Sequence, residues 1–246
     1  MKNYELEVIA FDIESCLLAE QSGADRIELC ANPMEGGTTP SWGMIAEARK
    51  STDIQLFPII RPRGGDFLYN DLEFNIMCKD IQQCVELKCD GVVIGILDKN
   101  GNVDVARCAK LIEIAGDLDV TFHRAFDRVN NAEVSLEVII DLGCKRILTS
   151  GGFPKAVESI PTLKNLVEKA GDRLKIMVGS GVSSENIIDL AVQTGVTTFH
   201  SSARRLVGSK MDFKNIAMNE ELSYYSIDAN EVKKMKNKLE NHFQLH

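Results

Sequence analysis

The stretch Val120-Thr121-Phe122-His123-Arg124-Ala125-Phe126-Asp127 places an apolar strand directly before an imidazole, a guanidinium and a carboxylate. Strand side chains alternate between two faces, so Thr121 and His123 are expected to point toward a cavity, opposite to Phe122. His123 is then a candidate for proton transfer or metal ligation. A buried hydrogen-bonded pair that only holds the strand end explains His123 and Arg124 equally well, so the rest of the chain has to decide.

The same order of an apolar strand followed by a helix recurs along the whole chain. Eight such units, the last without its full helix, are the count of a closed (β/α)8 barrel of the TIM type. An open doubly wound sheet is the rival fold, but the G-x-G-x-x-G motif is absent after the first strand. The expected strands are residues 6–11, 26–30, 56–60, 91–95, 120–123, 146–149, 174–178 and 197–200, and the expected helices are 13–21, 41–50, 71–87, 103–115, 131–142, 159–170 and 184–193.

Two helices carry more detailed predictions. Asp12 is expected to cap the helix at 13–21. The helix at 71–87 is expected to bury an apolar face made of Leu72, Ile76, Ile81 and Val85.

The predicted barrel takes up residues 1–204, and residues 205–246 form a C-terminal extension. Tyr224 and Tyr225 fall in a predicted loop, and Asp228 precedes a predicted helix at 229–243. Apolar side chains recur at helical spacing in this last helix. We expect this stripe to pack on the barrel or on a second subunit.

Charge and composition limit the classes of partner and the compartment that we expect for this chain. Lys and Arg number 28 against 36 Asp and Glu, so the net charge of −8 repels nucleic acid and anionic membrane surfaces. The N-terminus resembles no secretory signal, and no apolar run approaches the roughly 20 residues that span a bilayer. Seven cysteines without a C-x-x-C motif are typical of free thiols in a reducing compartment, which predicts a cytoplasmic protein. Those inside predicted helices are interpreted as core residues: Cys16, Cys78, Cys84 and Cys108.

Polar residues gather at the carboxyl ends of the predicted strands, where barrels of this type carry their active sites. Six strand ends converging on one rim are hard to explain by packing alone, because buried charges are costly unless paired. The residues are Glu28 and Cys30 (second strand), Arg61 and Arg63 (third), His123, Arg124 and Asp127 (fifth), Ser150, Gly151 and Gly152 (sixth), Gly179, Ser180 and Gly181 (seventh), and His200 and Ser201 (eighth).

These residue types indicate acid–base chemistry on a small anionic substrate, such as a phosphorylated one. Arginines offer bidentate forks to a carboxylate or phosphate, and glycine loops expose N–H groups to an anion. The alternatives are ordinary turns for the glycine loops and an Arg61–Glu28 salt bridge. The predicted catalytic set is Glu28, Arg61, His123, Arg124, Asp127 and His200, and the predicted anion-binding set is Arg63, Ser150, Gly151, Gly152, Gly179, Ser180, Gly181 and Ser201.

A metal site is the other hypothesis. Cys30 is the one cysteine predicted at the carboxyl end of a strand and facing inward. One thiolate with one or two imidazoles suits Cu(I) or Zn(II).

Several blocks of the chain, in order, resemble the CutC family, named for copper homeostasis. The blocks are residues 24–30, 35–41, 60–69, 120–127, 148–151 and 199–204. The resemblance implies a cytoplasmic (β/α)8 barrel, often a homo-oligomer, that takes part in copper homeostasis by binding copper. The family's proposed copper ligands are cysteines at the ends of the first two strands; Cys30 matches the second, whereas Ile9 stands at the first.

Overall fold

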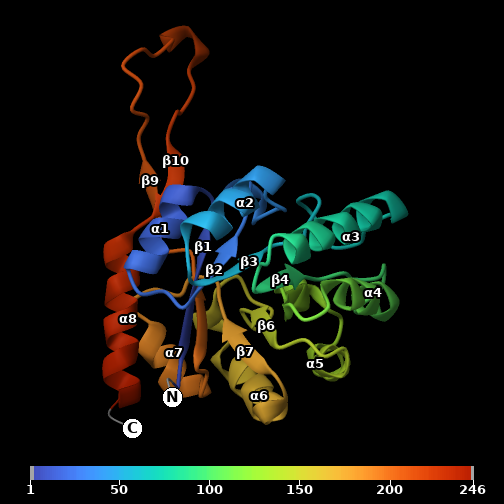
Figure 1. Cartoon of the computed structure of the whole chain (residues 1–246). Coiled ribbons are helices and arrows are strands. Elements are labelled where there is room, and N and C mark those ends of the chain that lie inside the picture. The colour runs from blue at the N-terminus through green and yellow to red at the C-terminus, as the bar shows by residue number, and fades with distance from the viewer. Residues whose placement is uncertain (1–2, 245–246) are drawn as a thin grey trace.

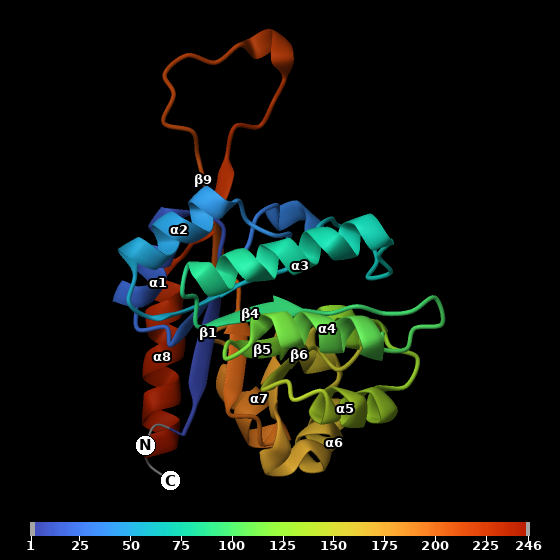
Figure 2. The same ribbon diagram turned by 45° about the vertical axis from the view of Figure 1, so that its right-hand side comes forward.

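The computed structural model describes residues 3–244, which form a closed barrel with a protruding arm (Figures 1 and 2). The barrel strands are β1 (Glu5–Ala10), β2 (Arg26–Leu29), β3 (Gln55–Pro58), β4 (Gly91–Ile94), β5 (Asp119–Phe122), β6 (Arg146–Thr149), β7 (Lys175–Val178) and β8 (Thr198–Ser201). The helices between them are α1 (Ile13–Gln21), α2 (Trp42–Ser51), α3 (Asp71–Glu86), α4 (Val105–Ala115), α5 (Ala132–Asp141), α6 (Ile160–Ala170) and α7 (Ile187–Thr194).

The eight strands are parallel and follow the order β3-β2-β1-β8-β7-β6-β5-β4. The sheet closes between β3 and β4, where the Ile60 amide donates to the Val93 carbonyl at 2.8 Å. The predicted (β/α)8 barrel is therefore confirmed. The predicted cap is confirmed too, because the Asp12 side chain accepts from the Ser15 amide at 2.6 Å.

The apolar face predicted for α3 is partly wrong. Ile81 is buried as expected, but its buried neighbours are Met77 and Cys84. Leu72 is 76% exposed, and Ile76 and Val85 are also exposed. The reason is that the true face includes a methionine and a cysteine, which fill core space as well as an aliphatic side chain does.

Ionic groups fill the barrel interior at the amino ends of the strands. The guanidinium groups of Arg26 and Arg146 lie on the ring of Phe57, each 5.0 Å from its centroid. Arg26 is 1% exposed and also bonds to Glu5 and Glu7. This layer closes one end of the barrel, so the opposite end is the open one.

The C-terminal extension consists of an arm and a helix. The arm is the segment from β9 (Arg204–Val207) to β10 (Tyr224–Ile227), two antiparallel strands joined by a long loop that stands off the barrel (Figure 1). The prediction of a loop at Tyr224 and Tyr225 is thus wrong, because both pair with β9.

The last helix, α8 (Ala229–Gln244), lies along the barrel wall beside α1 and α7. It buries Val232, Met235 and Leu239 completely, each worth about 1.5–3 kcal/mol of apolar burial. The predicted barrel began at residue 1 and the predicted extension ended at residue 246. Residues 1–2 and 245–246 lie outside the described residues.

Candidate functional site

A cavity of about 600 Å³ opens at the carboxyl ends of the strands. All six predicted catalytic residues line it, together with three residues of the predicted anion-binding set. Those lining residues are Glu28, Arg61, His123, Arg124, Asp127, Gly152, Ser180, Gly181 and His200. Among the described residues, Cys30, Arg63, Ser150, Gly151, Gly179 and Ser201 are predicted site residues that do not line it.

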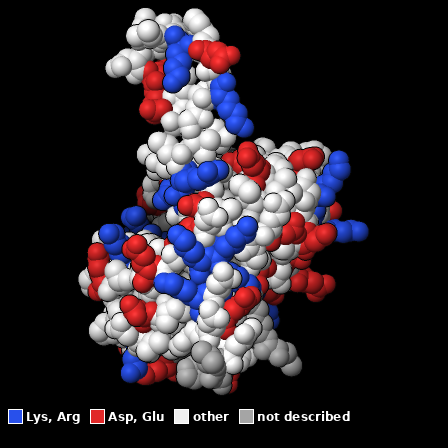
Figure 3. All heavy atoms as spheres, turned by 90° about the vertical axis from the view of Figure 1, so that its left-hand side faces the viewer, with Lys and Arg blue, Asp and Glu red and all other residues white. Residues whose placement is uncertain are grey.

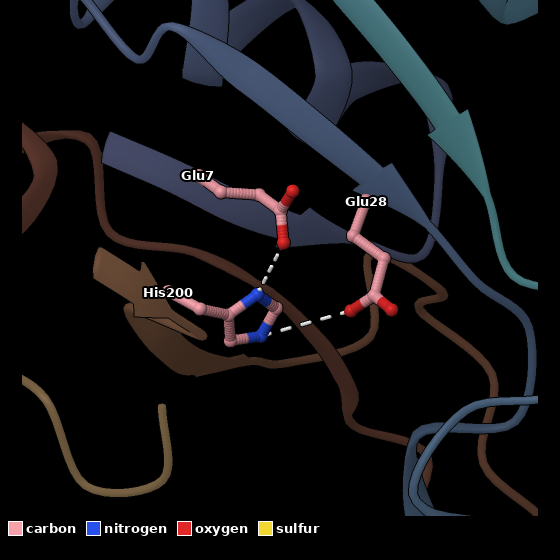
Figure 4. A group of neighbouring side chains, drawn as sticks. All are labelled: Glu7, Glu28 and His200. Atoms are coloured by element: carbon pink, nitrogen blue, oxygen red, sulfur yellow. Dashed lines mark hydrogen bonds and ion pairs between the residues drawn. The ribbon is translucent and has the colours of Figure 1, made fainter. Parts of the chain in front are cut away.

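Three titratable side chains meet where β1, β2 and β8 lie side by side, as Figure 4 shows. His200 Nδ1 is 2.7 Å from Glu7 Oε1, and His200 Nε2 is 3.7 Å from Glu28 Oε2. Glu7 Oε2 also accepts from Arg26 Nε at 2.5 Å. Glu7 therefore holds two cationic groups below the cavity, while Glu28 and His200 reach the cavity itself.

The surroundings separate the pKa values of the two carboxyl groups. Burial opposes ionisation of Glu7, but the Arg26 and His200 charges and their hydrogen bonds lower its pKa to about 2. Burial raises the pKa of Glu28 to about 7, although the His200 charge opposes this. Burial would lower the pKa of His200, but the two carboxylates raise it above its usual value. Glu28 is thus the group that exchanges a proton near neutral pH, an arrangement typical of acid–base sites.

Glu7 is the main residue that sequence reasoning missed. It lies two positions before Ile9 on β1, so both share the inward face, and the parity argument used for Glu28 and Cys30 would have found it. A carboxylate on the inner face of a buried strand predicts a cationic partner inside the barrel, because a buried charge is costly unless it is paired.

The hydrogen bond and the burial of His123 decide its chemical state. Its Nδ1 accepts a hydrogen bond from the Ala125 amide at 3.1 Å, so the proton lies on Nε2. Burial, with the Arg61 charge, lowers the pKa of His123 to about 3. In this environment His123 is a neutral hydrogen-bond donor, and its role in proton transfer stays a prediction.

The Nε2 atom of His123 is buried and has no partner in the described residues. The ring packs on Phe67, with 4.8 Å between centroids, and lies over Gly95. A Cβ atom at Gly95 would be 2.4 Å from the ring, so only glycine leaves the ring this position. The ring is held firmly while one N–H remains for a ligand in the cavity.

We expect nitrogen NMR to find His123 neutral, with the proton on Nε2, from pH 5 to 8. Burial keeps the charged form inaccessible in that range. A His123→Gln variant assigns the signal among the four histidines. Titration of this ring near pH 6.5 would contradict the assignment.

The loop after β6, predicted to bind an anion, is filled by the chain's own carboxylate. Asp127 Oδ1 accepts from the amides of Ser150 and Gly152, both at 3.0 Å, and Thr149 Oγ1 accepts from the Gly151 amide. These N–H groups are not available to a ligand in this structure. The sequence does not reveal this, because the 3₁₀ helix Arg124–Arg128 that carries Asp127 folds onto the loop only in three dimensions.

The two arginines after β3, of which Arg61 was predicted as catalytic and Arg63 as anion-binding, hold loops together. Arg61 donates to the carbonyls of Glu35 and Gly37, both at 2.6 Å, and to that of Gly65 at 3.0 Å. Its Nε has no partner in the described residues, and it forms no salt bridge with Glu28 there. Arg63 pairs with Asp66 and Glu73 outside the cavity.

The loops after β7 and β8 differ from each other. Gly179 donates to the Thr149 carbonyl, and the Ser201 hydroxyl donates to the Val182 carbonyl at 2.7 Å, so both serve the chain itself. In the described part of the chain, the amides of Ser180 and Gly181 donate to no other residue. Both residues have positive φ and line the cavity. Among the described residues of the predicted glycine loops, these two N–H groups therefore have no partner in the chain.

Cys30 lies inside the barrel rather than in the open cavity. Its thiol is 1% exposed among Ile9, Phe57, Ile59 and Val93. Burial, with the charges of Glu28 and Glu7, raises its pKa well above the usual value. A thiol in this environment resists forming the thiolate that binds metals, and Ile9 offers no second ligand.

The closed barrel, with a cavity lined by titratable side chains at the carboxyl ends of its strands, defines a (β/α)8 barrel protein. The chain belongs to the CutC family, whose model matches residues 4–205. It is 48% identical over 245 residues to a protein named CutC from Bacteroides fragilis, covering 98% of each chain. It is 43% identical over 235 residues to the human copper homeostasis protein cutC homolog, covering 94% of this chain and 86% of the human one.

A solved structure gives the same fold. The copper homeostasis protein CutC of Streptococcus agalactiae, in a crystal structure, is 38% identical with a TM-score of 0.78. The match covers 81% of this chain and 98% of that one.

Proposed function

We propose that this chain takes part in copper homeostasis. The supporting observation is its membership of the CutC family, with relatives named for that role over nearly the whole chain. Cells that lack the chain should differ from complemented cells in copper tolerance or copper content. Equal tolerance and equal copper content in both would argue against the role.

The barrel mouth offers one donor set for copper. His200 Nε2 and the Glu28 carboxylate lie together, and both reach the cavity. Nitrogen and oxygen donors suit Cu(II) better than Cu(I), which prefers thiolates. The set does not match the two-cysteine site implied by the family resemblance, because Cys30 is buried beside Ile9.

We expect Cu(II) to bind at this mouth more tightly as the pH rises from 6 to 8. The metal competes with the Glu28 proton, and the pKa of that carboxyl is about 7. His200→Gln should abolish binding in a chelator competition titration, whereas His242→Gln, on α8, should not change it. Binding retained in His200→Gln would remove His200 as a ligand, and loss in Cys30→Ser would instead support the thiol.

A second candidate function is acid–base chemistry on a small anion. The specific observation is the His123 Nε2–H, which has no partner among residues 3–244 and lies in a cavity that Glu28 also lines. Four arginines line the cavity (Arg61, Arg124, Arg128 and Arg204) against three acidic residues (Glu28, Glu35 and Asp127), an excess of positive charge in a protein of net charge −8. Such a surface attracts an anion and opposes a free cation.

In this reading each group has one role. His123 would donate to a carbonyl or similar oxygen, Glu28 would move the proton, and Ser180 and Gly181 would hold the anionic end with their amides. Inorganic phosphate tests the last role: it should perturb the amide NMR signals of Ser180 and Gly181. Phosphate that leaves both signals unchanged would count against anion binding there.

We further infer a cytoplasmic location and a homo-oligomer. All seven cysteines are free thiols, which is typical of reducing compartments. No helix in the described chain is long and apolar enough to cross a bilayer.

The arm supports the homo-oligomer. It presents exposed apolar side chains, with Phe213 73% and Ile216 91% exposed, and Figure 3 shows uncharged residues over much of its end. Sedimentation of the full chain as a single-chain species would argue against the oligomer.

A further inference from the structure

Three arginines are buried in the described part of the chain, and they differ in how their charges are balanced. Arg26 is 1% exposed and bonds to the Glu7 carboxylate, and Arg146 is 5% exposed and bonds to the Asp119 carboxylate at 2.6 Å. Arg61 is also 5% exposed, but it forms no ion pair with any carboxylate in residues 3–244. Arg61 is therefore a buried cation without a counter-charge, which is costly unless a partner supplies the negative charge.

Three carbonyls hold Arg61, but a carbonyl carries no net charge. The Nη1 atom donates to the carbonyls of Glu35 and Gly37, and the Nη2 atom donates to that of Gly65. These bonds fix the guanidinium between the loops that follow β2 and β3. The Nε–H group is buried and has no acceptor among the described residues. Arg61 thus lacks both a negative partner and one hydrogen-bond acceptor.

His123 supplies a second donor of the same kind. Both side chains contact the ring of Phe67: the Arg61 Cζ atom lies 5.1 Å from the Phe67 centroid, and the centroid of the His123 ring lies 4.8 Å from it. All three residues line the cavity. The His123 Nε2–H, like the Arg61 Nε–H, is buried without an acceptor in the described chain. Buried polar groups are nearly always hydrogen-bonded, so two such donors around one ring indicate an acceptor from outside the chain.

We propose that Arg61 and His123 form a carboxylate-binding subsite beside Phe67, and that the ligand of the cavity is a small carboxylic acid. The subsite has one positive charge without a counter-charge and two N–H donors without acceptors. A carboxylate carries one negative charge and two acceptor oxygens, so it matches both. A phosphate monoester brings a further negative charge and a third oxygen, which these two donors do not satisfy.

The surroundings of the subsite suit such an acid. The cavity, of about 600 Å³, is in the size range of small-molecule sites. The exposed Arg128, whose Cζ atom lies 5.8 Å from the Phe67 centroid, adds positive charge that attracts a carboxylate. The uncharged body of the acid can pack against the apolar side chains that also line the cavity, namely Ile9, Phe11, Ile59 and Leu148.

This inference rests on the second candidate function, the binding of a small anion in the cavity, and names the chemical group that is bound. The acceptor of the His123 N–H becomes a carboxylate oxygen, with Arg61 as its counter-charge. The Ser180 and Gly181 amides, on the loop after β7, are not part of this subsite. The two sets of donors can therefore be tested separately.

The test is a titration of the wild-type full chain with propionate at constant ionic strength, followed by NMR of the side-chain N–H groups. Propionate should shift the Arg61 Nε–H and His123 Nε2–H signals, because both groups donate to its carboxylate. Propionamide has the same shape without the charge, so it should leave both signals unchanged. Unchanged signals with propionate would overturn the subsite. Equal shifts with propionamide would overturn it as well, since the Arg61 charge would then play no part.

Two variants separate the charge from the second donor. Arg61→Gln removes the charge and should abolish propionate binding. His123→Phe keeps a ring against Phe67 without the N–H, and it should raise the Kd for propionate roughly tenfold or more, because a hydrogen bond to a charged group is lost. The matched control is Arg63→Gln, after the same strand but outside the cavity, which should leave the Kd unchanged. Wild-type affinity in both Arg61→Gln and His123→Phe would overturn the subsite, and the wild-type titration needs neither variant to fold.

Inorganic phosphate distinguishes failure of this subsite from failure of anion binding in the cavity as a whole. If phosphate shifts the amide signals of Ser180 and Gly181 while propionate shifts neither side-chain signal, the carboxylate subsite is overturned and anion binding stands. If neither ligand shifts any of these signals, both proposals are overturned. Propionate shifts at Arg61 and His123 alone would support the subsite and count against the amides.

Discussion

Glu7→Gln should lower the free energy of unfolding by about 3–5 kcal/mol, because it leaves a buried cation without its carboxylate. Arg26 is 1% exposed, and its Nε is 2.5 Å from Glu7 Oε2. His200 would lose its charged partner as well. Glutamine keeps the shape of the side chain, so the loss measures charge rather than packing.

Urea unfolding at pH 7 measures this effect. A matched control is Glu137→Gln, which breaks an exposed ion pair with Arg173 and should leave stability unchanged within error. If Glu7→Gln proved no more destabilising than the control, the Glu7 cluster would not stabilise the barrel.

The effect should also depend on pH. The folded pKa of Glu7, about 2, is below its usual value of 4.5, so its stabilisation is complete above about pH 4.5 and disappears as the pH falls toward 2. The folded pKa of His200 is raised above 6.5, so the stabilisation from its charge is present below that pH and lost as the pH rises through the folded value. The stability difference between wild type and Glu7→Gln should therefore shrink in acid.

The fold could be predicted from sequence because its signals are local. Each strand is a short apolar run, and each helix has its own periodicity and caps, so eight units can be counted without knowing their contacts. The β9–β10 pairing was missed because it joins Arg204 and Ile227, which are far apart in the chain. No local sequence pattern predicts which distant segment pairs with a strand.

The candidate site was predicted only in part, for the same reason. The alternation of side chains along a strand predicted that Glu28 faces the barrel mouth, and the positions of His123 and His200 at the carboxyl ends of their strands predicted the same for them; all three line the cavity. Chemical state depends on neighbours instead: the Ala125 amide fixes the tautomer of His123, and burial moves its pKa away from neutral pH. Residue type alone therefore suggested the location of His123 in the cavity, but it could not give the protonation state of the ring.

Asp127→Ala should destabilise the barrel by about 3–5 kcal/mol, and added acetate should restore much of that loss. The carboxylate of Asp127 is nearly buried and bonds to the amides of Ser150 and Gly152 and to Arg124 Nε at 2.7 Å. Its removal leaves these donors without an acceptor, which is costly in a buried position.

Acetate or formate can enter the space and accept the same hydrogen bonds. Ligand that binds only the folded state stabilises it in proportion to the logarithm of its concentration. The melting temperature of Asp127→Ala should therefore rise with acetate at constant ionic strength, while chloride should have no such effect. The control is Asp66→Ala, because that carboxylate is 70% exposed in its pair with Arg63.

The outcome decides which loop of the mouth is open to a ligand. Rescue by acetate would mean that the loop after β6 is an anion site already occupied by Asp127, as its hydrogen bonds indicate. An outside anion would then use the Ser180 and Gly181 amides, in the cavity that His123 and Glu28 also line. If Asp127→Ala loses stability but its melting temperature does not rise with acetate, Asp127 acts mainly by pairing with Arg124 rather than by occupying an anion-binding loop.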